Sequence, residues 1–167
     1  MGKLKNFKKT PFEIANILTN NSTIRKLVTI DSKDALSKDG ELSAEEMLKQ
    51  DYISFYAPIE SGIKNVTHNT FIIINLEDFN FYATEGNTSA SGAVYITTDA
   101  SHALLEGNKL RLLELLDEVE NTLNNVKLTV AGKIEVFSAT FIVLSEFRSG
   151  YRISFRCNDL QSRKAEI

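Results

Sequence analysis

The sequence predicts an α+β protein: a mostly antiparallel β-sheet with a long amphipathic helix packed on it and short N-terminal helices. The apolar residues between 109 and 123 recur at steps of three and four, as on the buried face of a helix. Strand-like runs lie on both sides of that helix, and the last of them alternates apolar and polar residues. No repeat or linker divides the chain, so we expect one domain over residues 1–167.

Composition excludes several classes of protein. The chain has 167 residues, of which 43% are hydrophobic and 25% are charged, enough for a core of ordinary size. No apolar run approaches the roughly 20 residues that span a bilayer, and no signal-like apolar stretch follows the first residues. The single cysteine, Cys157, excludes an intrachain disulfide and favours a reducing compartment. We therefore expect no membrane association.

The charge balance argues against a specific nucleic-acid reader. The net charge is −3 and the pI is near 5.5, whereas DNA-binding domains usually carry a basic face. One local exception is the basic stretch 1–9, which contains Lys3, Lys5, Lys8 and Lys9. The simplest interpretation is a flexible, solvated arm, and the alternative is contact with an acidic partner or nucleic acid.

The first fifty residues predict short helices. Thr10 and Glu13 match a capping box with Pro11 at the first helical position. Asn20-Asn21 can end that helix, and Ser22 can cap a second one, unless the two form one bent helix. After a polar loop at 31–41, a second capping box begins a helix that ends near residue 50; its residues are Ser43 and Glu46.

The middle of the chain predicts strands. Residues 52–56 and 71–76 are aromatic, β-branched and apolar, as strands are, and 78–82 either continues the second strand or pairs back on it. The segment 85–92, EGNTSASG, has the composition of a loop, and 93–98 follows as another strand.

The best-defined helix runs from Lys109 to Leu123, with Asn108 as its cap. Its polar positions include Lys109, Arg111 and several acidic residues, which we expect to face solvent. Its apolar stripe should lie on the sheet that includes Ile153, Phe155 and Cys157. The stripe consists of Leu112, Leu115, Leu116, Val119 and Leu123.

Three strands complete the prediction, at 127–130, 134–144 and 151–158, with a turn at 148–150 between the last two. In the final strand Tyr151 and every second residue after it face one way, so Cys157 should be buried. The tail 160–167 is polar and should fray.

No motif indicates catalysis, a metal or a cofactor. His68 and His102 belong to no metal-ligand pattern, and Asp99 with His102 would supply only two ligands. Cys157 on an apolar face should be an inert thiol. Neither a nucleophile elbow nor a phosphate-binding glycine loop is present. We therefore expect no enzyme and no cofactor; an enzyme of unrecognised type would need a pocket that gathers a histidine with carboxylates.

Charged faces supply the candidates for a subunit interface or an acidic lumen. Arg152 and Arg156 share the polar face of the last strand, where solvation is the simpler interpretation and contact with a neighbour the alternative. On a neighbouring subunit they could pair with carboxylates of the long helix. Those carboxylates are Glu114, Asp117, Glu118 and Glu120.

The order of elements resembles a known family. Ile24-Arg25-Lys26-Leu27 in the N-terminal helices, Val94-Tyr95-Ile96 in a strand and Leu110-Arg111-Leu112 at the start of the long helix precede a C-terminal hairpin. This order, over residues 10–158, resembles the small neck and tail-completion proteins of tailed phages, of the tail-terminator type. The loops 31–41 and 85–92 are additions to that pattern.

The resemblance implies a structural virion protein that forms a ring at the phage neck or tail end, in head–tail joining or as a tail terminator. A hexamer is one candidate ring, with other neck or tail proteins as partners and DNA passing through the lumen. Such a protein resides in the virion, and in the host cytoplasm during assembly. The alternative is a monomeric protein-binding module that uses an exposed strand edge.

Overall fold

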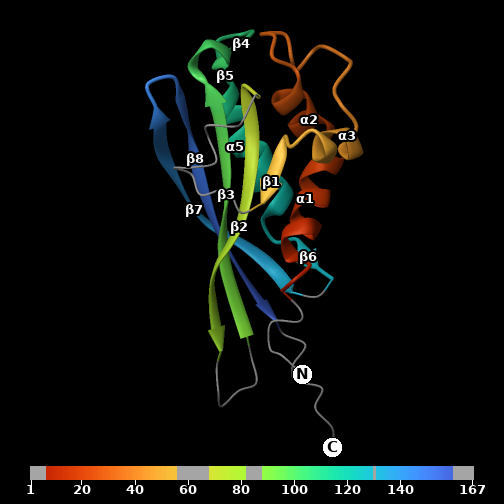
Figure 1. Ribbon diagram of the computed structural model, residues 1–167, viewed down its shortest axis with the longest axis vertical. Helices are drawn as coiled ribbons and strands as arrows, with labels where there is room; N and C mark the ends of the chain where they lie inside the picture. Colours follow the sequence, from red (N-terminus) through yellow and green to blue (C-terminus); the bar gives the residue numbers. More distant parts are fainter. Residues whose placement is uncertain (1–6, 56–67, 82–87, 130, 160–167) are drawn as a thin grey trace, which may run out of the picture.

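The computed structural model describes residues 7–55, 68–81, 88–129 and 131–159. Helices lie against one face of a six-stranded sheet whose strand order is β1-β2-β3-β8-β7-β6 (Figure 1). A two-stranded hairpin of β4 and β5 precedes the principal helix. The helices and strands, in chain order, are α1 (Thr10–Asn20), α2 (Ser22–Thr29), α3 (Ala44–Lys49), β1 (Ile53–Phe55), β2 (Thr70–Phe81), β3 (Thr88–Asp99), the 3-10 helix η2 (Ala100–His102), β4 (Leu104–Leu105), β5 (Lys109–Leu110), α5 (Arg111–Leu123), β6 (Lys127–Leu128), β7 (Gly132–Ser145) and β8 (Arg148–Asp159).

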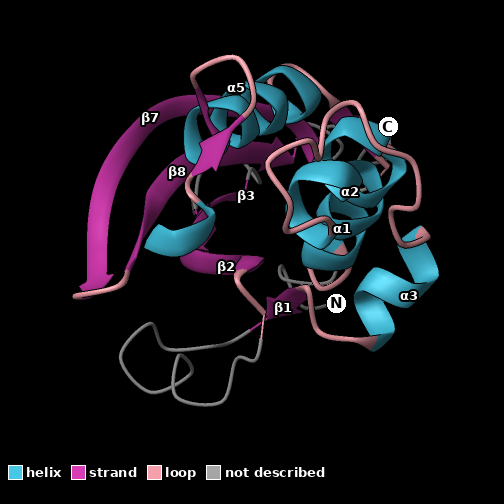
Figure 2. Cartoon of the chain, turned by 90° about the horizontal axis from the view of Figure 1, so that it is seen from above, coloured by secondary structure: helices cyan, strands magenta, loops and turns pink. Residues whose placement is uncertain are grey.

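The sheet confirms the predicted class. All its neighbouring strands are antiparallel except β1, which runs parallel to β2 with Ile53 opposite Ile72. Residues 78–81 continue β2 through an irregularity after Leu76. Seen from above, the sheet curls, and β7 arches out of the layer formed by β2 and β3 (Figure 2). The pairing of β7 with β8 shifts register near both of its ends. These irregularities fit the arch of β7, because bulges increase the local twist of a strand.

The main core lies between the helices and the sheet. The stripe of α5 is buried as predicted, with Leu115, Val119 and Leu123 fully enclosed and Leu116 partly so. On the sheet it joins Ile153, Phe155 and Cys157, which confirms the predicted inward face of β8. The helix has thirteen residues, so the prediction of a long helix is slightly overstated.

A smaller apolar cluster occupies the opposite face of the sheet. It consists of Phe71, Ile73, Ala93 and Tyr95, with Ile142 packed against them. The centre of β2 is therefore buried on both faces, which explains its uninterrupted apolar run.

The N-terminal helices differ from prediction in their caps. Lys9 is the N-cap of α1, and the Thr10 hydroxyl lies inside the first turn without a hydrogen-bond partner among the described residues. The Glu13 carboxylate instead accepts a hydrogen bond from the backbone N–H of Thr129, at 2.6 Å. Two separate helices form, because Asn21 is extended and its side chain caps α2 by accepting from the N–H of Ile24.

The second predicted capping box is confirmed. The Ser43 hydroxyl accepts from the backbone N–H of Glu46, and the Glu46 carboxylate accepts from the backbone N–H of Ser43. The helix ends at Lys49, one residue before the predicted end. Residues 31–41 form turns and bends, as expected for a loop.

The start of α5 corrects another prediction. Gly107 and Asn108 both adopt positive φ angles, 72° and 59°, and connect β4 to β5. Asn108 therefore belongs to a hairpin and cannot cap the helix, which begins two residues later than predicted, at Arg111.

Two strands, β3 and β8, begin earlier than predicted, and each includes a glycine that was assigned to the preceding loop or turn. Gly92 was expected in a loop but lies within β3, where a β-carbon would collide with the backbone oxygen of Asn75. Gly150 was expected in a turn but lies within β8, where a β-carbon would collide with the oxygen of Ile96. The turn before β8 is at residues 146–147 instead. Residues 1–6, 85–87 and 160–167 of the predicted arm, loop and tail lie outside the described part.

Candidate subunit interface

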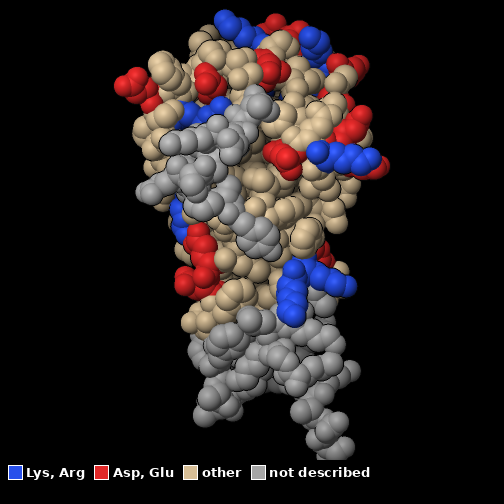
Figure 3. Space-filling model, viewed as in Figure 1, with Lys and Arg blue, Asp and Glu red and all other residues tan. Residues whose placement is uncertain are grey.

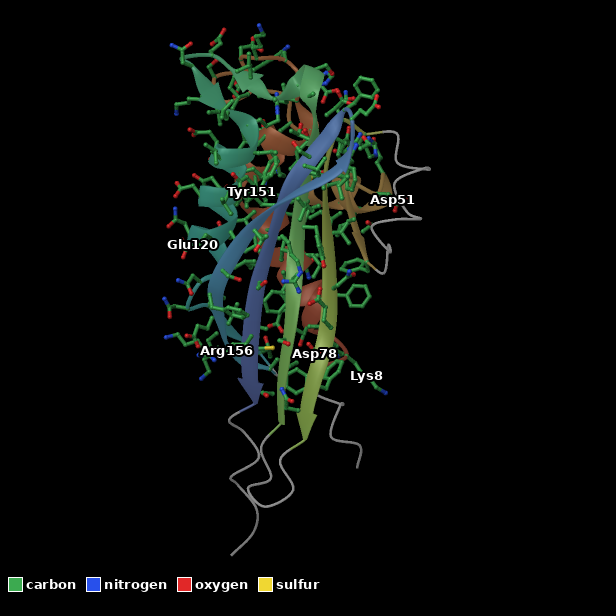
Figure 4. All side chains as sticks on the ribbon, turned by 90° about the vertical axis from the view of Figure 1, so that its left-hand side faces the viewer. Lys8, Asp51, Asp78, Glu120, Tyr151 and Arg156 are labelled. Atoms are coloured by element: carbon green, nitrogen blue, oxygen red, sulfur yellow. The ribbon has the colours of Figure 1, made fainter. Side chains whose placement is uncertain are left out.

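The acidic residues of α5 lie on the side of the helix that faces away from the sheet, and Figure 4 places Glu120 there. Glu114 forms an ion pair with Lys109 at 3.3 Å. The Glu118 carboxylate accepts from the side-chain amide of Asn21 at 3.0 Å, and that of Glu120 accepts from Asn124 at 2.9 Å. Asp117 is exposed. Three of the four carboxylates thus have side-chain partners within the chain, Glu114 through a partly exposed ion pair, while Asp117 faces outward.

Arg156 lies toward the end of β8 (Figure 4), on the face of the strand opposite Phe155 and Cys157 and so away from the helices. Its guanidinium donates to both carboxylate oxygens of Glu135 on β7, at 2.9 and 3.1 Å. This hydrogen bonding lowers the pKa of the Glu135 carboxyl. Both side chains are about half exposed, so a neighbouring molecule can reach the pair.

Arg152 joins a network across three strands. Its guanidinium forms an ion pair with Glu77 of β2 and donates to the hydroxyl of Tyr95 on β3 at 3.1 Å. The Tyr95 hydroxyl in turn donates to Glu77 at 2.8 Å. Burial is the main cause of the raised pKa of Tyr95. Arg152 and Arg156 therefore have carboxylate partners within their own chain, which the sequence could not indicate because strand register was unknown.

The charged groups consequently occupy two opposite sides of the protein. The carboxylates of α5 lie outside the helix layer, whereas both arginines lie on the sheet face away from that layer. Figure 3 shows acidic and basic side chains interspersed on the face it presents.

Arg111 is a residue that the sequence analysis misplaced on the solvated face of the helix. It is fully buried, and its guanidinium donates to five backbone carbonyls. Burial lowers its pKa. The five carbonyls belong to His102, Leu27, Ile30, Asp31 and Ser32. The only feature of the sequence that could have indicated this burial is the position of Arg111 at the very start of an amphipathic helix.

An apolar groove lies between the start of α5 and the arching strand β7. Phe141 packs edge-on against Tyr151, with ring centroids 5.5 Å apart. Leu110 and Leu113 of the helix start are 45% and 46% exposed at its rim. The sequence could not indicate this groove, because it is formed only when the β4–β5 hairpin and the curled strand β7 come together. Its lining residues are Ala103, Leu110, Leu112, Leu113, Phe141, Ser149 and Tyr151.

Both histidines form hydrogen bonds: His68 with the backbone carbonyl of Gln50, and His102 with two polar side chains. His68 stacks on Tyr52 with ring centroids 3.7 Å apart. His102 contacts the Ser101 hydroxyl at 2.8 Å and the Asn69 amide at 3.3 Å. Asn69 also donates to the Asp31 carboxylate, at 2.8 Å.

The described residues contain no group of three or more His, Cys, Asp or Glu residues placed to hold a metal ion. None of the helices they form combines the length and apolar character needed to cross a bilayer.

Fold and surfaces define an α+β protein with a curled sheet, two charged sides and an apolar groove beside a strand edge. Residues 21–157 match the model of the YomW family, and the chain belongs to that family. The family is phage-associated, its name being that of a yom gene of SPβ-like Bacillus prophages, so the chain is of phage type. No curated protein sequence gives a significant match.

Proposed function

We propose that this protein is a structural subunit of the phage particle that forms a ring at the neck or the tail end, in head–tail joining or tail termination. Its phage-type family supports the particle as its place of action. The observation that carries the proposal is that exposed charged side chains lie on two opposite sides: Glu114 and Asp117 outside α5, and Arg152 and Arg156, each with a carboxylate partner, on the far sheet face.

A ring needs two different, complementary patches on each subunit, because each contact joins the front of one copy to the back of the next. In this arrangement the carboxylates of one α5 approach the arginines of its neighbour. Arg156 can exchange or share its exposed carboxylate partner, since a guanidinium has donors for more than one acceptor.

The same arrangement suits a conduit for DNA. Any α5 carboxylates that line the lumen repel phosphates, so that DNA slides rather than adheres. We propose a role without catalysis, with other neck or tail proteins as partners, in the virion and beforehand in the host cytoplasm. A hexamer is one candidate ring.

Charge reversal tests the proposal. The variant with Glu114→Lys and Asp117→Lys should remain folded, because both side chains point outward, but should lose ring assembly. Native mass spectrometry and electron microscopy, alone and with neck and tail proteins of the same phage, would give the stoichiometry. A matched control reverses Glu45 and Glu106, which are also exposed but lie away from the outer face of α5. Equal assembly of both double variants would contradict the proposal.

The alternative function is a monomeric module that binds a protein segment along a strand edge. The observation that favours it is the apolar, incompletely paired edge of β7. It predicts a monomer at every concentration, and binding that is insensitive to the charges of α5.

A further inference from the structure

Within the part of the chain that the structure describes, one edge of the sheet is largely uncovered by other strands. β6 pairs with β7 only at Gly132 and Lys133, and the side chain of Asn124 accepts from the backbone N–H of Val136. From Phe137 to Ser145, β7 pairs with β8 on one side and with no strand among the described residues on the other. Unpaired backbone donors and acceptors in such an edge are a template for another strand.

The sequence of this edge lacks the usual protection against pairing. Natural edges carry charged residues, proline or β-bulges, or are short. Residues 137–145, FSATFIVLS, contain no charge, no proline and no glycine, and their register shifts fall only at the two ends. Phe137, Phe141 and Val143 are 58%, 54% and 71% exposed. An edge of this kind is prone to pair with a strand of another molecule.

The distribution of exposed apolar side chains indicates which partner fits. Among the described residues, all but one of the large exposed apolar side chains lie on β7, on the turn after it, or on the hairpin and helix start beside the groove. The exception is Phe12 of α1, which packs on Phe55. Among the described residues, a different patch on a second copy would bring few exposed apolar side chains, whereas the same patch matches itself. The clustered residues are Leu104, Leu110, Leu113, Phe137, Phe141, Val143 and Phe147.

The charges at the two ends of the edge favour one orientation. Exposed Lys133 precedes the uncharged stretch and exposed Glu146 follows it, while Glu135 is already paired with Arg156. Antiparallel pairing of two copies brings the start of one edge toward the end of the other, so opposite charges approach. Parallel pairing would bring like charges together.

We propose that β7 of a second copy of this chain pairs antiparallel with β7 across a twofold axis, which joins the two sheets and buries the apolar groove residues of both copies. This contact is isologous, so it is distinct from the head-to-tail contacts of the proposed ring and does not depend on them. Combined with such a ring, it makes the number of copies in the assembly even.

The variant Val143→Lys tests the pairing, because it places a charge within the uncharged stretch 137–145, on a side chain that is mostly exposed. The matched control is Phe12→Lys, at a residue of 53% exposure away from β7. Circular dichroism checks that both remain folded. If Val143→Lys fails to fold, Thr140→Lys on the same exposed edge replaces it.

The mass of each purified variant in solution, from light scattering across a concentration series, is the first measurement. We expect the mass of the wild-type assembly to be halved by Val143→Lys and unchanged by Phe12→Lys. Backbone amides of residues 137–145 should exchange more slowly with deuterium in the wild type than in Val143→Lys. A wild-type protein that is monomeric at its solubility limit, or a Val143→Lys variant with wild-type mass and exchange, would overturn the proposal.

The two proposals fail separately. If Val143→Lys leaves the mass unchanged while reversal of Glu114 and Asp117 lowers it, the ring stands and the pairing is wrong. If Val143→Lys halves the mass while the charge reversal has no effect, the pairing stands and the ring contact is wrong.

Discussion

The guanidinium of Arg111 donates a hydrogen bond to the backbone carbonyl of Ile30 over 2.8 Å, and so fastens the first turn of α5 to the C-terminal end of α2. Carbonyls at the end of a helix have no partner within it, and a buried arginine with five donors can satisfy several at once. Arg111 therefore acts as a shared cap for residues that precede it by about eighty positions.

Replacement of Arg111 by methionine should lower the free energy of unfolding by about 3 kcal/mol, because buried carbonyls lose their donors. Urea denaturation would measure the loss. The control Arg156→Met removes an exposed arginine and should cost under about 1 kcal/mol. Similar losses for the two variants would mean that the Arg111 contacts contribute little.

Two of the residues predicted as caps, Ser43 and Thr10, should respond differently to substitution. Ser43→Ala removes the confirmed cap of α3 and should cost about 1 kcal/mol. Thr10→Val keeps the shape of a buried side chain whose hydroxyl has no partner among the described residues, so it should be neutral or stabilising. Thermal or urea unfolding compares them; a larger loss for Thr10→Val would show that its hydroxyl is bonded.

Gly92→Ala should destabilise the sheet by about 2 kcal/mol, within the range for overpacking of a filled core. A β-carbon there meets the Asn75 backbone and the ring of Phe155. Ser91→Ala, at the neighbouring position, is the control and should change stability little. Wild-type stability in Gly92→Ala would mean that β2 and β3 can separate slightly at this point.

The Glu135–Arg156 pair gives a prediction about pH. Because Arg156 lowers the pKa of Glu135 in the folded state, the stabilisation is present above the carboxyl's unfolded pKa and is lost as pH falls through the folded one. In Arg156→Gln, the pKa of Glu135 from an NMR titration should rise toward its ordinary value of 4.5. An unchanged pKa would show that the ion pair does not persist in solution.

Much of the fold was predictable because it depends on local patterns. The stripe of α5 and the alternation of β8 each follow from a period in the sequence, and the structure confirms both. The capping box at Ser43 is equally local. At Thr10 the same pattern failed, because Glu13 forms a hydrogen bond to Thr129, far along the chain. Cap motifs therefore predict well only where no tertiary contact competes for the side chains.

The candidate interface was predictable in part for the same reason. Helical periodicity correctly placed Glu114 and Asp117 on the outer side of α5. The partners of Arg152 and Arg156 depend on which residues lie opposite them on neighbouring strands, and the sequence contains no short-range record of that register. The burial of Arg111 likewise depends on where α2 ends in space.

The strand order has a consequence for how the chain reaches this fold. β2 with β3, and β7 with β8, are hairpins between neighbouring segments, whereas β3 with β8 joins residues on either side of α5. Contacts between distant residues are slow to form, because a long loop must close before they stabilise anything. We therefore expect both hairpins to form early and their docking along β3 and β8 to limit the folding rate. Substitutions in that seam should slow refolding more than substitutions in either hairpin turn.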